Sequence, residues 1–208
     1  MEIYCLDIRA FSPHWEEALA LVSGERRALA LHQPTEDALL RSLAGGVLLR
    51  RFLGDAPLSY GPHGKPFLPG GPGFSLSHGG ELAVLALDGG EVGVDVESAR
   101  RPWRTRTAER MFRPEERAAL RPGDGEGFFT LWTRKEAVLK CCGEGLRLSP
   151  ASFSVLDGQC SLGGVAYHLQ THLLSGHVLS AASLRPSPAR PRLLSWEELL
   201  GKEMTHAL

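Results

Sequence analysis

No apolar run in the sequence approaches the roughly 20 residues that a membrane-spanning helix requires. The first ten residues, MEIYCLDIRA, mix acidic with apolar side chains and have no basic flank, unlike a signal or transit peptide. We therefore expect a cytoplasmic protein without a membrane partner.

Cysteine is scarce as well. The four thiols are Cys5, Cys141, Cys142 and Cys160, and no two of them form a CxxC pair. This spacing disfavours both a zinc knuckle and a thioredoxin-type redox site. Free, buried thiols are the better interpretation.

The chain as a whole has no excess of one charge. Its 23 basic and 24 acidic side chains leave a net charge of −1, which argues against a general binder of polyanions. The distribution is uneven, because residues 1–100 carry 8 basic and 13 acidic side chains and residues 101–208 carry 15 and 11. Residues 100–121 alone hold eight arginines against three glutamates. Such a run suits an acidic partner, although charge alone favours a solvated, salt-bridged helix face.

What remains is the composition of an ordinary globular protein. The 208 residues, 43% hydrophobic and 23% charged, suffice for one large or two small domains. Periodicity and turn residues predict, in the first half, a strand at 2–9, helices within 14–54, a loop at 55–73, and strands at 74–78, 81–88 and 91–97. Thr35 should cap a helix that stops at Gly54, and a hairpin-type turn at 88–90 should join the last two strands.

The second half repeats helices first and strands after. Beyond a polar linker at 98–106, the predicted elements are helices at 105–112, 114–121 and 124–142, strands at 152–157, 164–174 and 177–184, and an extended tail at 185–192. We therefore predict an α+β fold of two halves, 1–100 and 101–208, that suggest a structural duplication.

The first candidate site is the segment GVDVE, Gly93 to Glu97. In a strand alternate residues share a face, so Asp95 and Glu97 would point one way and the valines the other. The two carboxylates would lie about 7 Å apart and would repel each other unless water or a cation intervened. Oxygen ligands suit Mg²⁺ or Mn²⁺ better than zinc. Taken alone, the motif is better explained as two solvated acids at a sheet edge.

The second candidate site is the helix that contains WTRKEAVLK. At about 3.6 residues per turn, Trp132, Glu136 and Lys140 form one stripe, and Lys135 lies on the neighbouring stripe. Glu136 would add a third carboxylate to a Mg²⁺ site, and the two lysines could neutralise phosphates. The plain alternative is an i,i+4 pair between Glu136 and Lys140 on a surface helix.

A loop and the end of a strand carry further polar groups. Gly64-Lys65-Pro66 is not a P-loop, because no Ser or Thr follows Lys65 and Pro66 opposes a helix there. Ser77 and His78 end a strand in FSLSHGG, but the final glycine of a nucleophile elbow is missing, which argues against a serine hydrolase.

In their order along the chain, the four segments resemble those of the phosphopantetheinyl transferases, specifically the larger single-chain type that activates peptide and polyketide synthetases. The family pattern is GKP, a strand ending in SH, G-[IV]-D-[IVL]-E and W-x-x-K-E-A-x-x-K, and the likeness spans roughly residues 1–185. Ser75 and Gly79 depart from the pattern, since the family often has Asn and Ser there. The resemblance implies a monomer whose two similar α+β halves have a pseudo-twofold arrangement, with the active site in the cleft between them.

By this resemblance the protein moves the 4′-phosphopantetheine arm of coenzyme A to a serine of an acyl, peptidyl or aryl carrier protein and releases adenosine 3′,5′-bisphosphate. Asp95, Glu97 and Glu136 would hold Mg²⁺ or Mn²⁺, Glu136 would also act as base, and Lys140 would assist the leaving phosphate. The residues implied in binding coenzyme A are Arg41, Gly64, Lys65, Pro66, Ser77, His78 and Lys135.

Carrier proteins are typically acidic around their serine, so the resemblance gives the arginine run at 100–121 a docking partner. A non-catalytic coenzyme A-binding protein is the main alternative. A nucleic-acid binder that stacks bases on Trp103 and Phe112 would leave the acidic pair and the KEA helix unexplained, and we expect no nucleic acid. His168 and His172 have the spacing of helical metal ligands, but their segment alternates like a strand, where they would lie about 13 Å apart.

Overall fold

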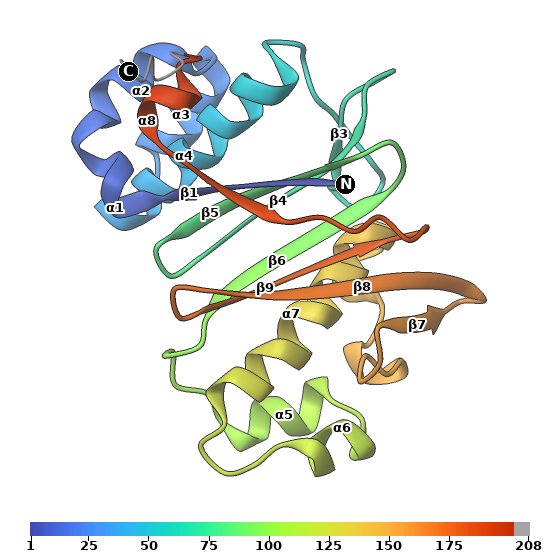
Figure 1. Ribbon diagram of the computed structural model, residues 1–208. Coiled ribbons are helices and arrows are strands. Elements are labelled where there is room, and N and C mark those ends of the chain that lie inside the picture. The colour runs from blue at the N-terminus through green and yellow to red at the C-terminus, as the bar shows by residue number, and fades with distance from the viewer. Residues whose placement is uncertain (202–208) are drawn as a thin grey trace, which may run out of the picture.

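The computed structural model describes residues 1–201, arranged in four layers (Figure 1). Helices cover one four-stranded sheet, a second four-stranded sheet packs on the other face of the first, and further helices cover the second sheet. The strands are β1 (Glu2–Asp7), β2 (Ser59–Tyr60), β3 (Pro66–Phe67), β4 (Gly73–Gly79), β5 (Leu82–Asp88), β6 (Val92–Ser98), β7 (Gln159–Leu162), β8 (Val165–Leu174), β9 (His177–Ser183) and β10 (Pro191–Leu194). The helices are α1 (Ile8–Phe11), α2 (Trp15–Leu21), α3 (Gly24–Leu31), α4 (Glu36–Leu53), α5 (Thr105–Met111), α6 (Pro114–Ala119), α7 (Gly125–Cys142) and α8 (Trp196–Leu199), with 3₁₀ turns at Ser12–His14, Gly145–Arg147 and Pro150–Ser152. The predicted α+β class is confirmed.

The two sheets divide strands that adjoin in sequence. Their orders are β10-β1-β5-β4 and β6-β9-β8-β7, and β2 and β3 form a separate ribbon. The prediction that the turn at 88–90 joins a hairpin is wrong, because β5 and β6 belong to different sheets. Strand β5 already pairs with β1 on one edge and β4 on the other, so β6 has no edge of it left to join.

The strand predicted at 152–157 is also wrong. Phe153 and Val155 are buried there, yet the backbone forms no strand. The Phe153 carbonyl accepts a hydrogen bond from Lys135, and the Val155 N–H donates to Glu116. Side chains from two helices thus satisfy backbone groups that a strand partner would otherwise bond.

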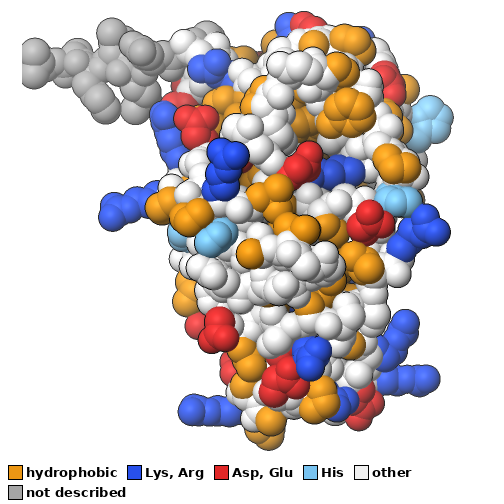
Figure 2. Space-filling view, turned by 90° about the vertical axis from the view of Figure 1, so that its right-hand side faces the viewer, with side chains coloured by type: hydrophobic (Ala, Val, Ile, Leu, Met, Phe, Trp, Pro, Cys, Tyr) orange, Lys and Arg blue, Asp and Glu red, His pale blue; other side chains and the backbone are white. Residues whose placement is uncertain are grey.

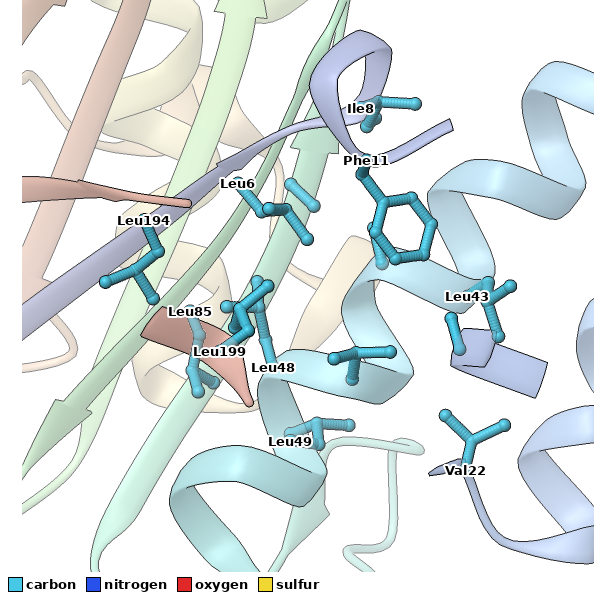
Figure 3. Close-up of a cluster of buried hydrophobic side chains, with 14 of the residues drawn as sticks. Leu6, Ile8, Phe11, Val22, Leu43, Leu48, Leu49, Leu85, Leu194 and Leu199 are labelled. Atoms are coloured by element: carbon cyan, nitrogen blue, oxygen red, sulfur yellow. The ribbon is translucent and has the colours of Figure 1, made fainter. Parts of the chain in front are cut away.

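Alternation along the strands supplies three apolar cores. One lies between the sheets and includes Ile3, Cys5, Val84, Val94 and Leu179. A second lies between the first sheet and helices α1 to α4, where Leu6, Leu43, Leu48 and Leu85 converge (Figure 3). The third lies between the second sheet and α7.

The end of the described chain returns to the first sheet. Strand β10 pairs with β1 in parallel, and Trp196 is buried in the helix-covered core of that sheet, as are Leu194 and Leu199 (Figure 3). Residues 191–199 therefore pack on the first sheet and its helices. The division at residue 100 and the pseudo-twofold relation of the halves stay predictions.

Both long helices begin and end as their sequences indicate. The Thr35 hydroxyl caps α4 by accepting from the Ala38 N–H at 3.2 Å, and Gly54 follows its last turn with φ 74°. Asp124 caps α7 by accepting from the Gly127 N–H at 2.7 Å. Among residues 1–201, no helix has both the length and the apolar character needed to cross a membrane.

Candidate active site

A cleft of about 280 Å³ lies where the GKP loop, β4 and α7 meet. From the loop it is lined by His63, Gly64, Lys65 and Pro66, and from α7 by Glu136, Leu139 and Lys140. Residues more than 70 positions apart in sequence are thus brought to one cavity. Five of the residues singled out from the sequence line it: Gly64, Lys65, Pro66, Glu136 and Lys140.

Strand β6 presents its acids toward α7, as the alternation predicts. The valines at 92, 94 and 96 are buried in the core between the sheets. On the opposite face a Cβ at Gly93 would overlap the carbonyl oxygen of Ala137, so the glycine is what lets α7 rest on the strand. This close contact sets Asp95 and Glu97 beside the helix that carries Glu136 and Lys140.

Asp95 is the centre of a hydrogen-bonded network. Its Oδ1 accepts from Ser77 Oγ at 2.8 Å and from Lys140 Nζ at 2.7 Å. Lys140 also donates to Ser77 Oγ at 2.9 Å and to the Val94 carbonyl at 3.0 Å. The other oxygen, Asp95 Oδ2, is buried without a hydrogen-bond partner among the described residues. One carboxylate oxygen is therefore open to a further ligand.

Glu97 and Glu136 lie in the field of this aspartate. Burial, and after it the carboxylate of Asp95, raises the pKa of Glu136. Burial also raises the pKa of Glu97, against the lowering effect of Arg101, whose Nη1 donates to both carboxylate oxygens at 3.0 Å. The three acids form a negative cluster, which Lys140 and Arg101 partly neutralise.

The donor chemistry of this cluster fits a hard divalent cation, and the unpaired Asp95 Oδ2 is the kind of buried oxygen that such an ion would satisfy. Within residues 1–201, however, no three His, Cys, Asp or Glu side chains come close enough to share a metal ion as they are arranged here. Lys140 instead binds Oδ1 of Asp95, and Arg101 binds both oxygens of Glu97.

Lys65 fastens the GKP loop to the rest of the site. Its ammonium forms an ion pair with Glu91 and donates to the carbonyls of Cys141 at 3.0 Å and Val92 at 3.3 Å. The loop is thereby joined to the end of α7 and the start of β6.

The structure places Lys135 outside the lining of the cleft, which does not support the predicted contact with a phosphate. Its ammonium is buried and is bound by Glu116 at 2.8 Å, the Pro150 carbonyl at 2.7 Å and the Phe153 carbonyl at 2.6 Å. Its side chain is 1% exposed and does not line the cleft, whereas Lys65 and Lys140 do, so a ligand in the cleft does not reach its ammonium. Lys135 is separated from Glu136 and Lys140 because it lies on a different stripe of α7.

His78 lies at the exposed end of β4, one residue beyond Ser77. Partial desolvation, and after it the charge of Arg41 on α4, lowers the pKa of His78. The two residues are therefore electrostatic neighbours, as a shared anionic ligand would require. His168 and His172 lie on β8, in agreement with the predicted strand.

Sequence reasoning missed two residues that shape the site. Glu116 could have been found in part, since Pro114 marks the first position of α6 and an acid at the third position can accept from the Arg113 N–H, as Glu116 does at 2.8 Å. Arg101 could not, because nothing in the sequence distinguishes it from the seven other arginines of the run.

Comparison with known proteins identifies the family of the chain. Residues 91–183 match the model of the 4′-phosphopantetheinyl transferase superfamily. A 4′-phosphopantetheinyl transferase of Bacillus subtilis is 32% identical over 71% of this chain and 73% of its own. The 4′-phosphopantetheinyl transferase Sfp of Bacillus subtilis (strain 168) is 29% identical over 89% of this chain and 92% of its own, and AcpT of Salmonella typhimurium is 44% identical over 47% and 56%. The chain therefore belongs to the 4′-phosphopantetheinyl transferase superfamily and is an enzyme of that class.

Proposed function

We propose that the protein transfers the 4′-phosphopantetheine arm of coenzyme A to a serine of an acyl, peptidyl or aryl carrier protein. The observation that carries this proposal is the network of Asp95, Ser77 and Lys140 beside Glu136, at a cleft lined by the GKP loop. The non-catalytic alternative is not supported, because the relatives that match are named as transferases.

In the proposed reaction Glu136 takes the proton of the serine hydroxyl, directly or through a water. The serine oxygen then bonds to the phosphorus that carries the pantetheine arm. The bond from that phosphorus to the adenosine-bearing phosphate breaks, and adenosine 3′,5′-bisphosphate leaves. Lys140 stabilises or protonates the leaving phosphate, since its ammonium lies in the same network as the acids.

Coenzyme A would occupy the cleft beside the GKP loop. Gly64, Lys65 and Pro66 line this cleft and would approach the pyrophosphate. Ser77 would orient Lys140, and His78 with Arg41 would contact the 3′-phosphate. Lys135 has no place in this proposal, because its ammonium is buried against Glu116 and its side chain does not line the cleft.

Asp95, Glu97 and Glu136 would hold Mg²⁺ or Mn²⁺. When bound, such an ion neutralises charge on the pyrophosphate. The oxygen donors of the cluster and the unpaired Asp95 Oδ2 support this assignment.

The carrier would dock against residues 100–121. Arg106 and Arg110 are exposed on α5, close in sequence to a cleft lined by Arg101, Trp103 and Arg104. On the face shown in Figure 2, acidic and basic side chains are interspersed. A local basic surface therefore supports an acidic protein partner better than a long polyanion. A monomer in the cytoplasm remains our expectation.

The deciding measurement is the intact mass of apo carrier proteins from fatty acid, polyketide and peptide synthesis after incubation with the protein, coenzyme A and Mg²⁺. Parallel samples contain a chelator, or the variant Glu136→Gln. Glu126→Gln is the matched control, because Glu126 is an exposed acid on the same helix.

A gain of one phosphopantetheine arm that is lost with the chelator and with Glu136→Gln, but kept in Glu126→Gln, supports the proposal. No gain on any carrier contradicts the transfer. Modification by Glu136→Gln at the wild-type rate contradicts its role as base.

A further inference from the structure

Arg101 lies between the acid cluster and a second cleft. Its Nη1 is 3.0 Å from both oxygens of Glu97, and the arginine side chain is 61% exposed against 16% for the glutamate. The same arginine lines a cleft of about 460 Å³, together with Trp103, Arg104, Phe128 and Trp132. One flexible cation thus borders two neighbouring sites.

The second cleft has an apolar wall and a basic rim. Trp103 stacks on Phe128 with ring centroids 4.6 Å apart, and Phe128 is 6.1 Å from Trp132. Trp132 stands four residues before Glu136 on α7, so both belong to one stripe of the helix. A partner seated in this cleft with an acidic side chain at its edge would meet Arg101 next to the acid cluster.

Lys140 and Arg101, the two cations that neutralise the acid cluster, are held differently. Lys140 has three acceptors, Asp95, Ser77 and the Val94 carbonyl. The guanidinium of Arg101 bonds only to Glu97 among the described residues. Because the Arg101 side chain is 61% exposed and has this single partner, solvent competes for its guanidinium, and Arg101 is the cation that can leave.

We propose that Arg101 is an exchangeable counterion that couples carrier docking to metal binding. It neutralises Glu97 in the free protein and moves to an acidic side chain of the docked carrier, which releases both Glu97 oxygens for the divalent ion. This inference rests on the proposed function. By linkage, the carrier and the ion must strengthen each other's binding by the same factor.

The test is Mn²⁺ affinity, measured from the electron paramagnetic resonance signal of the free ion at fixed ionic strength. The proteins are wild type, Arg101→Gln and Arg104→Gln, each with and without an apo carrier whose acceptor serine is replaced by alanine. Arg104 is the matched control, since it lines the same cleft and carries the same charge but forms no ion pair with Glu97.

We expect Arg101→Gln alone to bind Mn²⁺ about twofold to fivefold more tightly than wild type. The carrier should tighten Mn²⁺ binding by a similar factor in wild type and in Arg104→Gln, and not in Arg101→Gln. An Arg101→Gln variant that binds Mn²⁺ no more tightly than wild type, or that keeps the coupling, overturns the inference.

The mass assay separates this failure from failure of the proposed function. If wild type modifies carriers while the Mn²⁺ results go against Arg101, only the inference falls. If wild type neither binds Mn²⁺ nor modifies any carrier, the proposed function falls and the inference with it.

Discussion

Lys135 and Glu116 form an ion pair of 2.8 Å whose side chains are 1% and 0% exposed. Glu116 also accepts from the Val155 N–H at 2.8 Å and from the Arg113 N–H at 2.8 Å. The pair therefore joins α7, α6 and the irregular segment that begins at Pro150. Lys135, the residue beside Glu136 in the KEA motif, fixes α7 against the rest of the C-terminal layer.

Breaking this pair should be costly. Lys135→Met leaves the Glu116 carboxylate buried without its cation, so the free energy of unfolding should fall by about 3–5 kcal/mol in urea denaturation. The double variant Lys135→Met/Glu116→Leu should recover much of that loss, because no uncompensated charge remains. A single variant as stable as wild type would show that the pair is not formed in solution.

Gly93 should tolerate no side chain. The Cβ of Gly93→Ala would overlap the Ala137 carbonyl and push α7 away from β6, at a cost of about 1–3 kcal/mol or more. Transfer activity should fall too, because the acids and Lys140 are on the separated elements. Gly89→Ala is the control: a Cβ there meets nothing within 4 Å, and its effect should stay under about 1 kcal/mol. Equal losses in both variants would rule out the close contact as the cause.

His78 should make coenzyme A binding depend on pH. Because burial and Arg41 lower its pKa from 6.5, the free imidazole is neutral near pH 7 and becomes a cation only in more acidic solution. A 3′-phosphate favours the cation, so calorimetric affinity for coenzyme A should rise as pH falls through the lowered pKa. Affinity for 3′-dephospho-coenzyme A should rise less.

His78→Ala should remove this difference and weaken coenzyme A binding about tenfold to hundredfold at acidic pH. His63→Ala is the control, since His63 lines the cleft beside the GKP loop, where it pairs with Glu144 at 3.4 Å. If His78→Ala still distinguished the two ligands as wild type does, the histidine would not contact the 3′-phosphate.

Charge reversal on α5 should affect the carrier and not coenzyme A. Arg106→Glu/Arg110→Glu should raise the KM for the carrier about tenfold at low salt and reduce its dependence on ionic strength. Arg113 is left unchanged, because its side chain donates to the Ser152 carbonyl at 3.2 Å and supports the fold. Arg185→Glu/Arg190→Glu makes the same charge change at exposed positions outside the run. Carrier kinetics that change equally in both double variants would argue for a general charge effect.

Local sequence chemistry was enough to predict much of this protein. The caps of α4 and α7, the alternation of β6 and the α+β class follow from neighbouring residues, whose periodicity and hydrogen-bonding groups act over a few positions. The four motifs in their order resemble those of the transferase family, because each motif combines a short backbone conformation with particular chemical groups.

Only the tertiary structure decided which distant group each residue meets. It placed β5 and β6 in different sheets, since both edges of β5 were already paired, and it returned β10 to β1. It paired Lys135 with Glu116 and Arg101 with Glu97 in ion pairs, although charge alone allows many other partners. A sequence determines what a side chain can bind, but burial and distance in the folded chain select which partner it binds.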